Sequence, residues 1–287
     1  MKDFSGKLAV VTGGGSGIGR ALICALAAQG CSVAMCDIRL EGQLETKRLA
    51  EEVAPQGVRI TAFVADVSNP AQVQAFRDDV LAQHQADHIH LLFNNAGISG
   101  GGSFILDSPA AWERTFNVCW GGIYNNTRAF LPLLIKASEA HLINVSSVNG
   151  FWASLGPDSV HTAYSAAKFA VKGFTESLIN DLRLNAPHVK VSVVMPGHIG
   201  TSIALNSMME GYGKSAEELP EEMQRMAEEF RTRGLSPDAA AEVILTGVRS
   251  ERWRILVGAD AAWLDQAVRA EPEKAYEPDF LPPWARQ

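Results

Sequence analysis

Short apolar runs alternate with amphipathic stretches along most of the chain. Helical spacing of the apolar positions in the longer stretches predicts helices between the runs. Strands separated by helices at this pace are typical of a parallel sheet covered on both faces. We therefore predict one Rossmann-like, doubly wound α/β domain with about seven strands. The runs predict strands at Leu8–Val11, Val33–Cys36, Ile60–Val64, His90–Phe93, His141–Val145, Val189–Val194 and Arg254–Val257. The helices are predicted at Ile18–Ala28, Gln43–Val53, Pro70–Gln83, Ala110–Lys136, Ala163–Leu184 and Ala239–Val248.

Two regions depart from this alternation. Ser202–Gly234 is rich in methionine and glutamate and has no strand character. Glu271–Gln287 contains four prolines, which exclude a regular helix there. We expect residues 1–258 to form one domain that includes residues 202–234 as a long loop. Residues 259–287 are expected to form a C-terminal tail packed on that domain.

Composition narrows the class of protein. Of the 287 residues, 47% are hydrophobic and 20% charged, which is enough for a sizeable core and unlike a disordered chain. A formal net charge of −7 argues against a nucleic-acid partner. No stretch approaches the ~20 apolar residues of a membrane helix, the start lacks a signal-peptide core, and the four cysteines show no metal spacing. We expect a soluble, cytoplasmic globular protein with no nucleic-acid or membrane partner.

A glycine cluster, Thr12–Gly19, lies between the first predicted strand and the first helix. Glycines there let the backbone turn tightly and approach a pyrophosphate, whose charge lies at the positive N-terminus of the helix. A tight structural turn would use the same residues. The position directly after a buried strand favours nucleotide binding.

Two aspartates follow predicted strands on the same half of the chain. Asp37 comes about twenty residues after the glycine cluster, where a carboxylate accepts hydrogen bonds from both adenosine ribose hydroxyls and repels a 2′-phosphate. Asp66, followed by Val67, would lie beside the adenine ring. Both could instead be turn residues. Arg39 could meet a phosphate, but the glycine cluster holds no Lys or Arg, so NAD is favoured over NADP.

Tyr164 and Lys168 lie four residues apart at the start of a predicted helix. This spacing places the phenol and the ammonium on one helical face. A nearby cation lowers a tyrosine pKa that is ordinarily ~10, so Tyr164 is a candidate acid/base near neutral pH. The same pattern arises often by chance, and a surface pair is the alternative.

These motifs together, in this order, resemble the short-chain dehydrogenase/reductase family, in its compact branch with a T-G-x-x-x-G-x-G loop. The resemblance covers about residues 5–258 and rests on Thr12–Gly19, Asp66, Asn94–Gly97, Asn117, Ser146–Gly150, Tyr164 with Lys168, and Pro196–Thr201. It implies a hydride transfer between a nicotinamide cofactor and a substrate beside a general acid/base. It also implies that residues 1–258 are the catalytic domain and that residues 202–234 are its substrate loop.

The resemblance implies a catalytic tetrad of four residues. Tyr164 would exchange the hydroxyl proton and Ser147 would hydrogen-bond the substrate oxygen, with Ser146 as the alternative. Lys168 would bind the nicotinamide ribose and lower the pKa of Tyr164. Asn117 would interrupt its helix and hold a water that passes protons to solvent.

The resemblance also implies the cofactor-binding set. In it, the backbone of Asn94 would lie against the adenosine ribose, and Ile199 and Thr201 would hold the nicotinamide carboxamide. The set is Gly13, Ser16, Gly17, Ile18, Gly19, Asp37, Asp66, Val67, Asn94, Ala96, Gly97, Tyr164, Lys168, Pro196, Gly197, Ile199 and Thr201. The family further suggests a homotetramer or homodimer built from the helices at Ala110–Lys136 and Ala163–Leu184, whose apolar faces could equally be internal.

The segment from Ser147 to Tyr164 is a few residues longer than the family usually shows, and Leu155–Val160 is the expected extra loop beside the substrate pocket. Candidate pocket residues are Phe151, Trp152, His161 and His198. Trp152 could instead be simple packing. Neither histidine has a metal partner at ligand spacing, so no metal site is expected.

The combined prediction is NAD-dependent interconversion of a secondary alcohol and a ketone on a small-to-medium apolar substrate. An NADPH-dependent carbonyl or acyl-thioester reductase is the alternative within the family. A non-catalytic nucleotide sensor would need the glycine cluster without Tyr164 and Lys168, and both are present. The sequence does not name the alcohol, because the substrate loop sets specificity in this fold.

Overall fold

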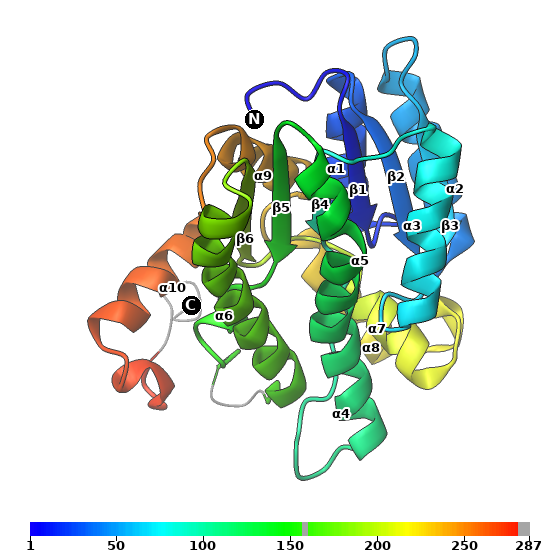
Figure 1. Ribbon diagram of the computed structural model, residues 1–287. Coiled ribbons are helices and arrows are strands. Elements are labelled where there is room, and N and C mark those ends of the chain that lie inside the picture. Colours follow the sequence, from blue (N-terminus) through cyan, green and yellow to red (C-terminus); the bar gives the residue numbers. More distant parts are fainter. Residues whose placement is uncertain (157–159, 281–287) are drawn as a thin grey trace.

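A single parallel sheet of seven strands forms the centre of the molecule (Figure 1). The computed structural model describes residues 1–156 and 160–280. The strand order is β3-β2-β1-β4-β5-β6-β7, which confirms the predicted Rossmann-like α/β fold. The strands are β1 (Leu8–Thr12), β2 (Ser32–Asp37), β3 (Ile60–Val64), β4 (Leu91–Asn94), β5 (Ala140–Val145), β6 (Val189–Pro196) and β7 (Arg254–Val257).

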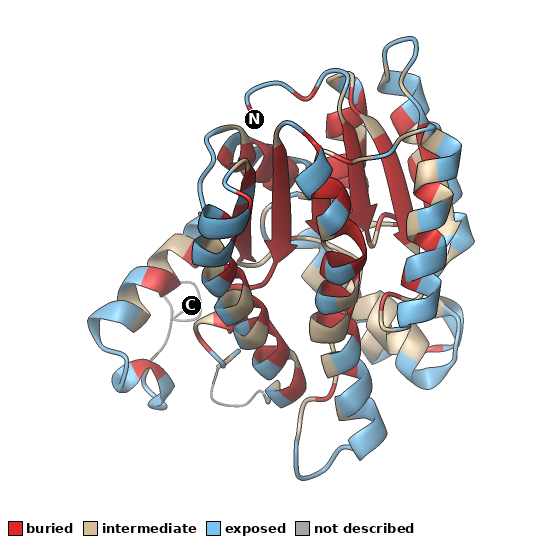
Figure 2. Cartoon of the chain, in the orientation of Figure 1, coloured by how far each residue is buried: buried red, intermediate tan, exposed pale blue. Residues whose placement is uncertain are grey.

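The central strands are apolar along their whole length because helices cover both faces of the sheet. All five residues of β1 and all six of β5 are buried. Val10 of β1 pairs with Ala34 of β2 on one side and with Leu92 of β4 on the other. Strands buried on both faces need no polar alternation, which is why short continuous apolar runs predicted them. Figure 2 shows the strands buried and the helices buried only toward the sheet.

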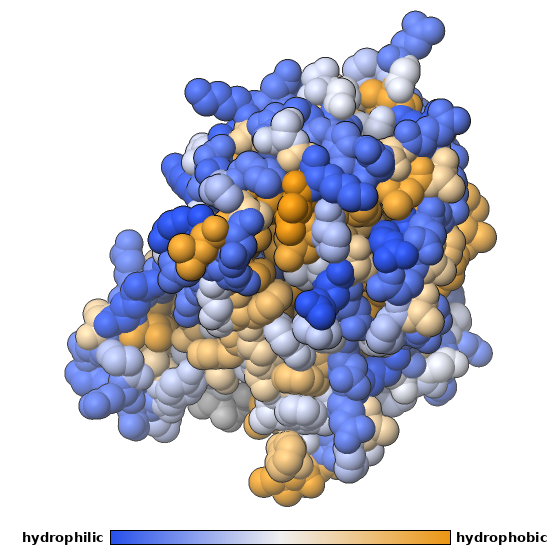
Figure 3. Space-filling view, viewed as in Figure 1, coloured by the Kyte–Doolittle hydropathy of each residue, from blue (hydrophilic) through white to orange (hydrophobic). Residues whose placement is uncertain are grey.

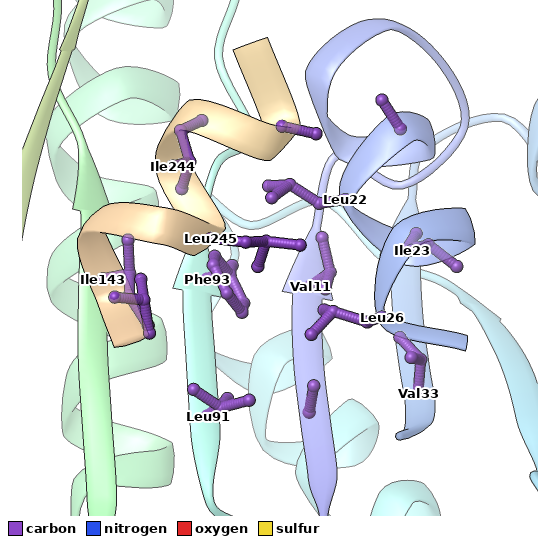
Figure 4. Packing of buried hydrophobic residues seen from close by; sticks show 14 of the residues in the cluster. Val11, Leu22, Ile23, Leu26, Val33, Leu91, Phe93, Ile143, Ile244 and Leu245 are labelled. Atoms are coloured by element: carbon purple, nitrogen blue, oxygen red, sulfur yellow. The ribbon is translucent and has the colours of Figure 1, made fainter. Parts of the chain in front are cut away.

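Two helical layers enclose the sheet. α1, α2 and α9 pack on one face and α3, α5 and α6 on the other. In Figure 4, Leu22 and Leu26 of α1 and Leu245 of α9 meet the sheet around Val11 and Phe93. The helices are α1 (Gly17–Ala28), α2 (Leu40–Val53), α3 (Pro70–His84), α4 (Pro109–Phe116), α5 (Gly122–Lys136), α6 (Thr162–Asn185) and α9 (Pro237–Arg249).

The single helix predicted over residues 110–136 is divided by a π-helical turn. This turn, η1 (Asn117–Gly121), joins α4 to α5, and the N–H of Gly122 donates to the carbonyl of Asn117 five residues earlier. A π-helical turn inserts one extra residue into the helix and shifts the side chains that follow it. The direction in which the side chains of this turn point is therefore set by the folded structure. It does not follow from regular helical spacing in the sequence.

The predicted substrate loop is helical. Residues 203–232 form α7 (Ile203–Tyr212), the short turn η3 (Ala216–Glu218) and α8 (Glu221–Thr232). α7 has no fully buried residue, so it lies on the body as a cover and contributes little to the core. In Figure 1, α7 and α8 lie below the carboxyl ends of the strands.

The chain after β7 contains a helix that the sequence interpretation did not assign. α10 (Ala259–Ala270) begins directly after Gly258, whose φ of 107° turns the chain back, and η4 (Lys274–Tyr276) follows it. Their apolar side chains form a small third core with Val148 and Trp152. The remaining tail residues 281–287, and residues 157–159 of the predicted loop Leu155–Val160, lie outside the described residues.

The loop between β4 and α4 presents three apolar side chains to solvent. Phe104, Ile105 and Leu106 are 75–90% exposed. This loop is the lowest part of Figure 1, and the same place in Figure 3 is an apolar projection. Its backbone supports the start of α6, because the Gly102 carbonyl accepts from the N–H of Thr162 at 2.9 Å. Among the described residues no helix is both long and apolar enough to cross a membrane.

Candidate active site

A cleft of about 570 Å³ opens at the carboxyl ends of the strands. It extends from the glycine loop after β1 to the residues after β5 and β6. The strand order reverses between β1 and β4, where open α/β sheets bind their ligands. Of the predicted site residues, the cleft is lined by Gly13, Ser16, Gly17, Ile18, Asp37, Asp66, Val67, Ala96, Gly97, Ser147, Tyr164, Lys168, Pro196, Gly197, Ile199 and Thr201.

The glycine loop fits a pyrophosphate group. Gly13 and Gly17 have φ of 68° and 53°, a region that favours glycine. A Cβ on Gly13 would lie 2.8 Å from the Cα of Ala96, so the loop fits against the end of β4 only without a side chain. The loop leads into the N-terminus of α1, where the helix dipole favours an anion.

Asp37 is fixed at the far edge of the cleft. Its Oδ2 accepts from the N–H of Gly15 at 3.0 Å and its Oδ1 from the N–H of Arg39 at 3.2 Å. The Arg39 side chain also lines the cleft, and no polar partner of its guanidinium occurs within residues 1–156 and 160–280. Arg20 is different, because its guanidinium donates to the carbonyl of Gly15 at 2.6 Å and to the hydroxyl of Thr46 at 2.9 Å.

Asp66 belongs to an ionic group that closes the cleft on another side. Burial acts to raise its pKa, but hydrogen bonds from Ser68 and the charge of Arg114 outweigh burial and lower the pKa below its ordinary value. Arg114 lies 3.6 Å from Asp66 and donates its Nε–H to Glu210 of α7 at 2.7 Å. Sequence reasoning missed Arg114 and Glu210, which are far apart in the chain and belong to no motif.

α7 is bound to the rims of the cleft by further polar contacts. The Asn206 amide donates to the hydroxyl of Ser16 in the glycine loop at 3.3 Å. The hydroxyl of Ser207 accepts from the N–H of Ser99, after β4, at 2.8 Å. The predicted substrate loop therefore covers the same cleft that the glycine loop lines.

Tyr164, Lys168 and Ser147 meet at the inner end of the cleft. The Lys168 side chain is buried and donates from Nζ to the carbonyl of Val145 at 3.0 Å. It lies 5.2 Å from the centre of the Tyr164 ring. Burial raises the pKa of the Tyr164 phenol above its ordinary value, while the charge of Lys168 and a hydrogen bond with Ser147 act to lower it. The net direction differs from the sequence prediction of a lowered pKa, because burial outweighs the cation.

The two serines of the Ser146–Gly150 motif have different partners. The Ser146 hydroxyl donates to the backbone carbonyl of Lys168 at 2.8 Å and so ties β5 to α6. The Ser147 hydroxyl accepts from the N–H of Asn149 at 3.1 Å and interacts with Tyr164. This arrangement supports Ser147, rather than Ser146, as the serine that meets a substrate oxygen.

Asn117 does not lie where the resemblance placed it. Its side chain is exposed and is absent from the described lining of the cleft. Cys119, two residues on, is fully buried, and burial raises the pKa of its thiol while the charge of Lys168 acts to lower it. A Cβ on Gly97 would lie 3.6 Å from both the Cys119 sulfur and the Lys168 nitrogen. The η1 turn thus directs Cys119, not Asn117, toward the catalytic side.

Asn94 also does not lie in the cleft, where the resemblance placed it. It is buried beneath the cleft, and its amide donates to Thr127 at 3.1 Å and to Asn144 at 2.8 Å. The next residue, Asn95, lines the cleft instead and donates its amide N–H to the carbonyl of Thr12 at 3.0 Å.

Gly19 also lies outside the described lining and supports the loop from within. A Cβ on Gly19 would lie 2.1 Å from the carbonyl oxygen of Gly13. Position 19 therefore has no room for a side chain, although Gly19 does not face the cleft.

The four predicted pocket residues are absent from the described lining of this cleft. Trp152 is buried against the C-terminal segment, and its indole N–H donates to the carbonyl of Ala275 at 2.8 Å. Phe151 lies beneath the guanidinium of Arg254, 5.7 Å from the ring centre. Both side chains are used in packing.

The two histidines also have local partners. His198 shares a hydrogen bond of 2.9 Å between its Nε2 and the carbonyl of Phe230 of α8. The His161 ring packs edge-on against Tyr164, with 4.7 Å between ring centres. Burial lowers the pKa of His161 to about 4, so its ring is neutral at physiological pH. His161 therefore supports the Tyr164 ring without adding charge.

Comparisons with known proteins agree with this arrangement. A family model described as short chain dehydrogenase matches residues 7–210. The putative oxidoreductase SadH of Mycobacterium tuberculosis is 36% identical over 271 residues, which cover 94% of this chain and 92% of the relative.

Solved structures also resemble most of the chain. A short-chain dehydrogenase/reductase from Burkholderia phymatum in complex with NAD has a TM-score of 0.81 and 30% identity, covering 96% of this chain and 95% of that one. A metagenomic short-chain oxidoreductase in complex with NADP has a TM-score of 0.66 and 27% identity, covering 88% of this chain and 97% of that one. By its fold, its family match and these relatives, the chain belongs to the short-chain dehydrogenase/reductase family of oxidoreductases.

Proposed function

We propose that this oxidoreductase interconverts a secondary alcohol and a ketone with NAD, using Tyr164 as the general acid/base. The observation that carries the proposal is the meeting of Tyr164, Lys168 and Ser147 at one end of a cleft whose other end holds Asp37. A proton-transfer group and a nucleotide-binding loop in one cleft suit a redox reaction that moves a proton with each hydride.

Each residue of the inner end has a proposed task. The Ser147 hydroxyl holds the substrate oxygen, and Tyr164 exchanges a proton with that oxygen. Lys168, anchored on Val145, orients the cofactor ribose and favours the phenolate. A bound nicotinamide supplies the hydride chemistry. Because burial raises the pKa of Tyr164, the phenol holds its proton at neutral pH. Ketone reduction is then favoured near neutrality, and alcohol oxidation under alkaline conditions.

The proposed cofactor is NAD. Asp37 offers a fixed carboxylate where a 2′-phosphate of NADP would meet negative charge. Arg39 argues in the other direction, since its guanidinium lines the same part of the cleft. We favour NAD because the carboxylate is held by two backbone N–H groups, whereas the long Arg39 side chain must be ordered to bind a phosphate. The related structures with NAD and with NADP show that the fold accommodates both cofactors.

The proposed substrate is small to medium and apolar. The cleft that Tyr164 lines also carries the apolar residues Ile98, Val118 and Ile203. Two cations of the lining already have partners, since Arg114 pairs with Glu210 and Asp66, and Lys168 donates to the carbonyl of Val145. These cations are therefore not free to bind an anionic substrate.

We also propose a homo-oligomer built through α5 and α6, as the family resemblance implies. Tyr124 of α5 and Phe169 of α6 are 46% and 42% exposed, and Leu184 at the end of α6 is 81% exposed. These apolar side chains face outward, although the helices also contribute to the core. Light scattering of the purified protein tests the proposal, and a monomeric mass at micromolar concentration would contradict it.

The function is tested by initial rates on a panel of secondary alcohols and ketones, with each of the two cofactors, between pH 7 and pH 10. We expect oxidation of an apolar secondary alcohol with NAD. Activity confined to NADPH with carbonyl compounds or acyl thioesters would favour the reductase alternative. Tight NAD binding without turnover of any substrate would favour a nucleotide sensor.

A further inference from the structure

The C-terminal segment, residues 259–280, packs against the chain that follows Ser147. The indole N–H of Trp152 donates to the carbonyl of Ala275 at 2.8 Å. The N–H of Ala153 donates to the hydroxyl of Tyr276 at 3.1 Å. Trp152 is 5% exposed, and its ring lies 5.7 Å from that of Phe280. Two hydrogen bonds and a ring contact thus fix the position of residues 152–153.

Asn149 links this contact to the catalytic end of the cleft. Its amide Nδ2 donates to the carbonyls of Trp152 and Ser154, both at 3.0 Å. Its backbone N–H donates to the Ser147 hydroxyl oxygen at 3.1 Å, and its Oδ1 lies 3.5 Å from that oxygen. Asn149 is 4% exposed, and both hydrogens of its amide are used. Few groups other than a buried amide could satisfy two carbonyls and face the serine.

We propose that Asn149 is a positioning residue for Ser147, and that the C-terminal segment holds Asn149 in place through Trp152. This inference rests on the proposed function, because it assigns Ser147 the substrate oxygen. A serine hydroxyl has three staggered rotamers. The backbone N–H of Asn149 donates to the Ser147 oxygen, and the Ser147 hydroxyl donates to the Asn149 Oδ1 at 3.5 Å. Both contacts select one rotamer of Ser147, and the second of them depends on the Asn149 side chain.

α10 also contacts the chain that follows β6. Its Asp260 carboxylate accepts from the N–H of His198 at 2.6 Å, next to Gly197 of the cleft lining. The C-terminal segment therefore contacts the chain after β5 and the chain after β6. The family model ends at residue 210, so this support comes from a part of the chain outside that match.

Three variants test the link. Asn149→Ala removes the side-chain amide, and Trp152→Phe removes the indole N–H together with one ring of a buried side chain. Tyr276→Phe removes only the hydroxyl that accepts from the N–H of Ala153. Trp253→Phe is the matched control, because Trp253 is 46% exposed and lies outside the link. One hydrogen bond is worth about 0.5–1.5 kcal/mol, so we expect kcat to fall about 3–10-fold in Trp152→Phe and further in Asn149→Ala. The Kd for NAD should stay within about twofold, because no cofactor-binding residue changes.

A pH measurement separates positioning from loss of structure. The hydrogen bond with Ser147 acts to lower the pKa of Tyr164. Loosening Ser147 should therefore move the apparent pKa of alcohol oxidation upward in Asn149→Ala and Trp152→Phe, but not in Trp253→Phe. The phenolate absorbance of Tyr164, taken as the difference from the matching Tyr164→Phe proteins, should shift in the same direction without any turnover.

The outcomes are distinct. Unchanged kcat and an unchanged Tyr164 titration in folded Asn149→Ala would overturn the inference. NAD affinity falling in parallel with kcat would also overturn it, because that pattern indicates general loosening. If the wild type turned over no substrate, the proposed function would fail, and the spectroscopic titration would still decide whether Asn149 acts on Ser147 and Tyr164. Tyr276→Phe supplies a variant whose exposed position leaves folding intact.

Discussion

The ammonium of Lys168 lies 5.2 Å from the centre of the Tyr164 ring and is held there by the carbonyl of Val145 at 3.0 Å. The i, i+4 spacing places both side chains on one face of α6, and β5 then fixes the distance between them. Because Lys168 is buried and Tyr164 is half-buried, their interaction is stronger than it would be between fully exposed groups. Burial nevertheless raises the pKa of Tyr164, so the cation moderates this effect without reversing it.

Replacing Tyr164 by Phe should abolish turnover and leave NAD binding nearly intact. The change removes the transferable proton and keeps the ring that packs against His161. Positioned acid/base groups contribute about 10²–10⁴-fold, so kcat should fall by at least about a hundredfold. Steady-state rates and a direct NAD titration measure the two quantities. Activity within tenfold of the wild type would show that another group carries the proton.

Lys168→Ala should lower both kcat and the affinity for NAD. Lys168 lines the cleft where the ribose is proposed to bind, and its charge acts to lower the pKa of Tyr164. The apparent pKa of alcohol oxidation should therefore rise in any residual activity. Circular dichroism controls for folding, since the side chain is buried. An unchanged Kd for NAD would contradict the proposed contact between Lys168 and the ribose.

We expect substitutions of Asn117 and of Cys119 to have different effects on catalysis. Asn117→Ala should keep kcat within about twofold, because exposed substitutions away from special contacts have small effects. Cys119→Ala should alter the pH dependence of kcat, since Cys119 is buried beside Lys168 and acts to raise the pKa of Tyr164. The apparent pKa should move downward. Pre-steady-state rates on both variants measure this. A loss of activity confined to Asn117→Ala would restore the role that the family resemblance gave to Asn117.

Acid should destabilise the protein through His141. This side chain is buried in β5 against Ser192, and burial lowers its pKa to about 3 from an ordinary 6.5. The unfolded chain then binds a proton between these values that the folded chain does not. Stability is therefore full above pH 6.5 and falls as the pH is lowered toward 3.

The magnitude follows from the pH interval. From pH 6.5 to pH 5, one such group costs about 2 kcal/mol of unfolding free energy. His141→Gln removes the titration and keeps a polar partner for Ser192. Urea unfolding at pH 7 and pH 5 should show a loss about 2 kcal/mol larger in the wild type than in the variant. Equal losses would mean that the His141 pKa is not lowered. His84, His90 and His161, whose pKa values are also lowered, contribute equally to both proteins.

Features encoded locally were predictable from the sequence. Apolar runs such as Leu8–Val11 located the strands because a strand buried on both faces needs little else. The i, i+4 spacing of Tyr164 and Lys168 predicted that both side chains lie on one face of a helix. α10 was also within reach, since Ala261, Leu264 and Val268 follow helical spacing.

Features encoded by distant contacts were not predictable. The bond between Trp152 and Ala275 joins residues 123 apart, and the pair Arg114–Glu210 joins residues 96 apart. Neither pair leaves a pattern in the local sequence. The orientation of Asn117 depends on the η1 turn, whose π-helical geometry is set by packing between α4, α5 and α6. The roles assigned to Ser147, Tyr164 and Lys168 stay predictions.

The last prediction concerns the choice of cofactor and rests on the geometry around Asp37. Its carboxylate is held by the N–H groups of Gly15 and Arg39 in a partly enclosed site. Charge-assisted hydrogen bonds from ribose hydroxyls contribute roughly 1.5–3 kcal/mol, so NAD should be preferred by at least about tenfold in kcat/KM. A 2′-phosphate would meet this carboxylate and be repelled.

Asp37→Ser should weaken NAD and improve NADP together. The hydroxyl keeps a hydrogen-bond partner for Gly15 but removes the negative charge, and the Arg39 guanidinium is then unopposed beside the ribose. We expect the ratio of kcat/KM values to move toward NADP by at least about tenfold, since both effects act in the same direction. The double variant Asp37→Ser with Arg39→Ala should lose the gain for NADP and keep the loss for NAD, which separates the two contributions. A wild type that already prefers NADP would show that Arg39 reaches past Asp37, and NAD would then no longer be the proposed cofactor.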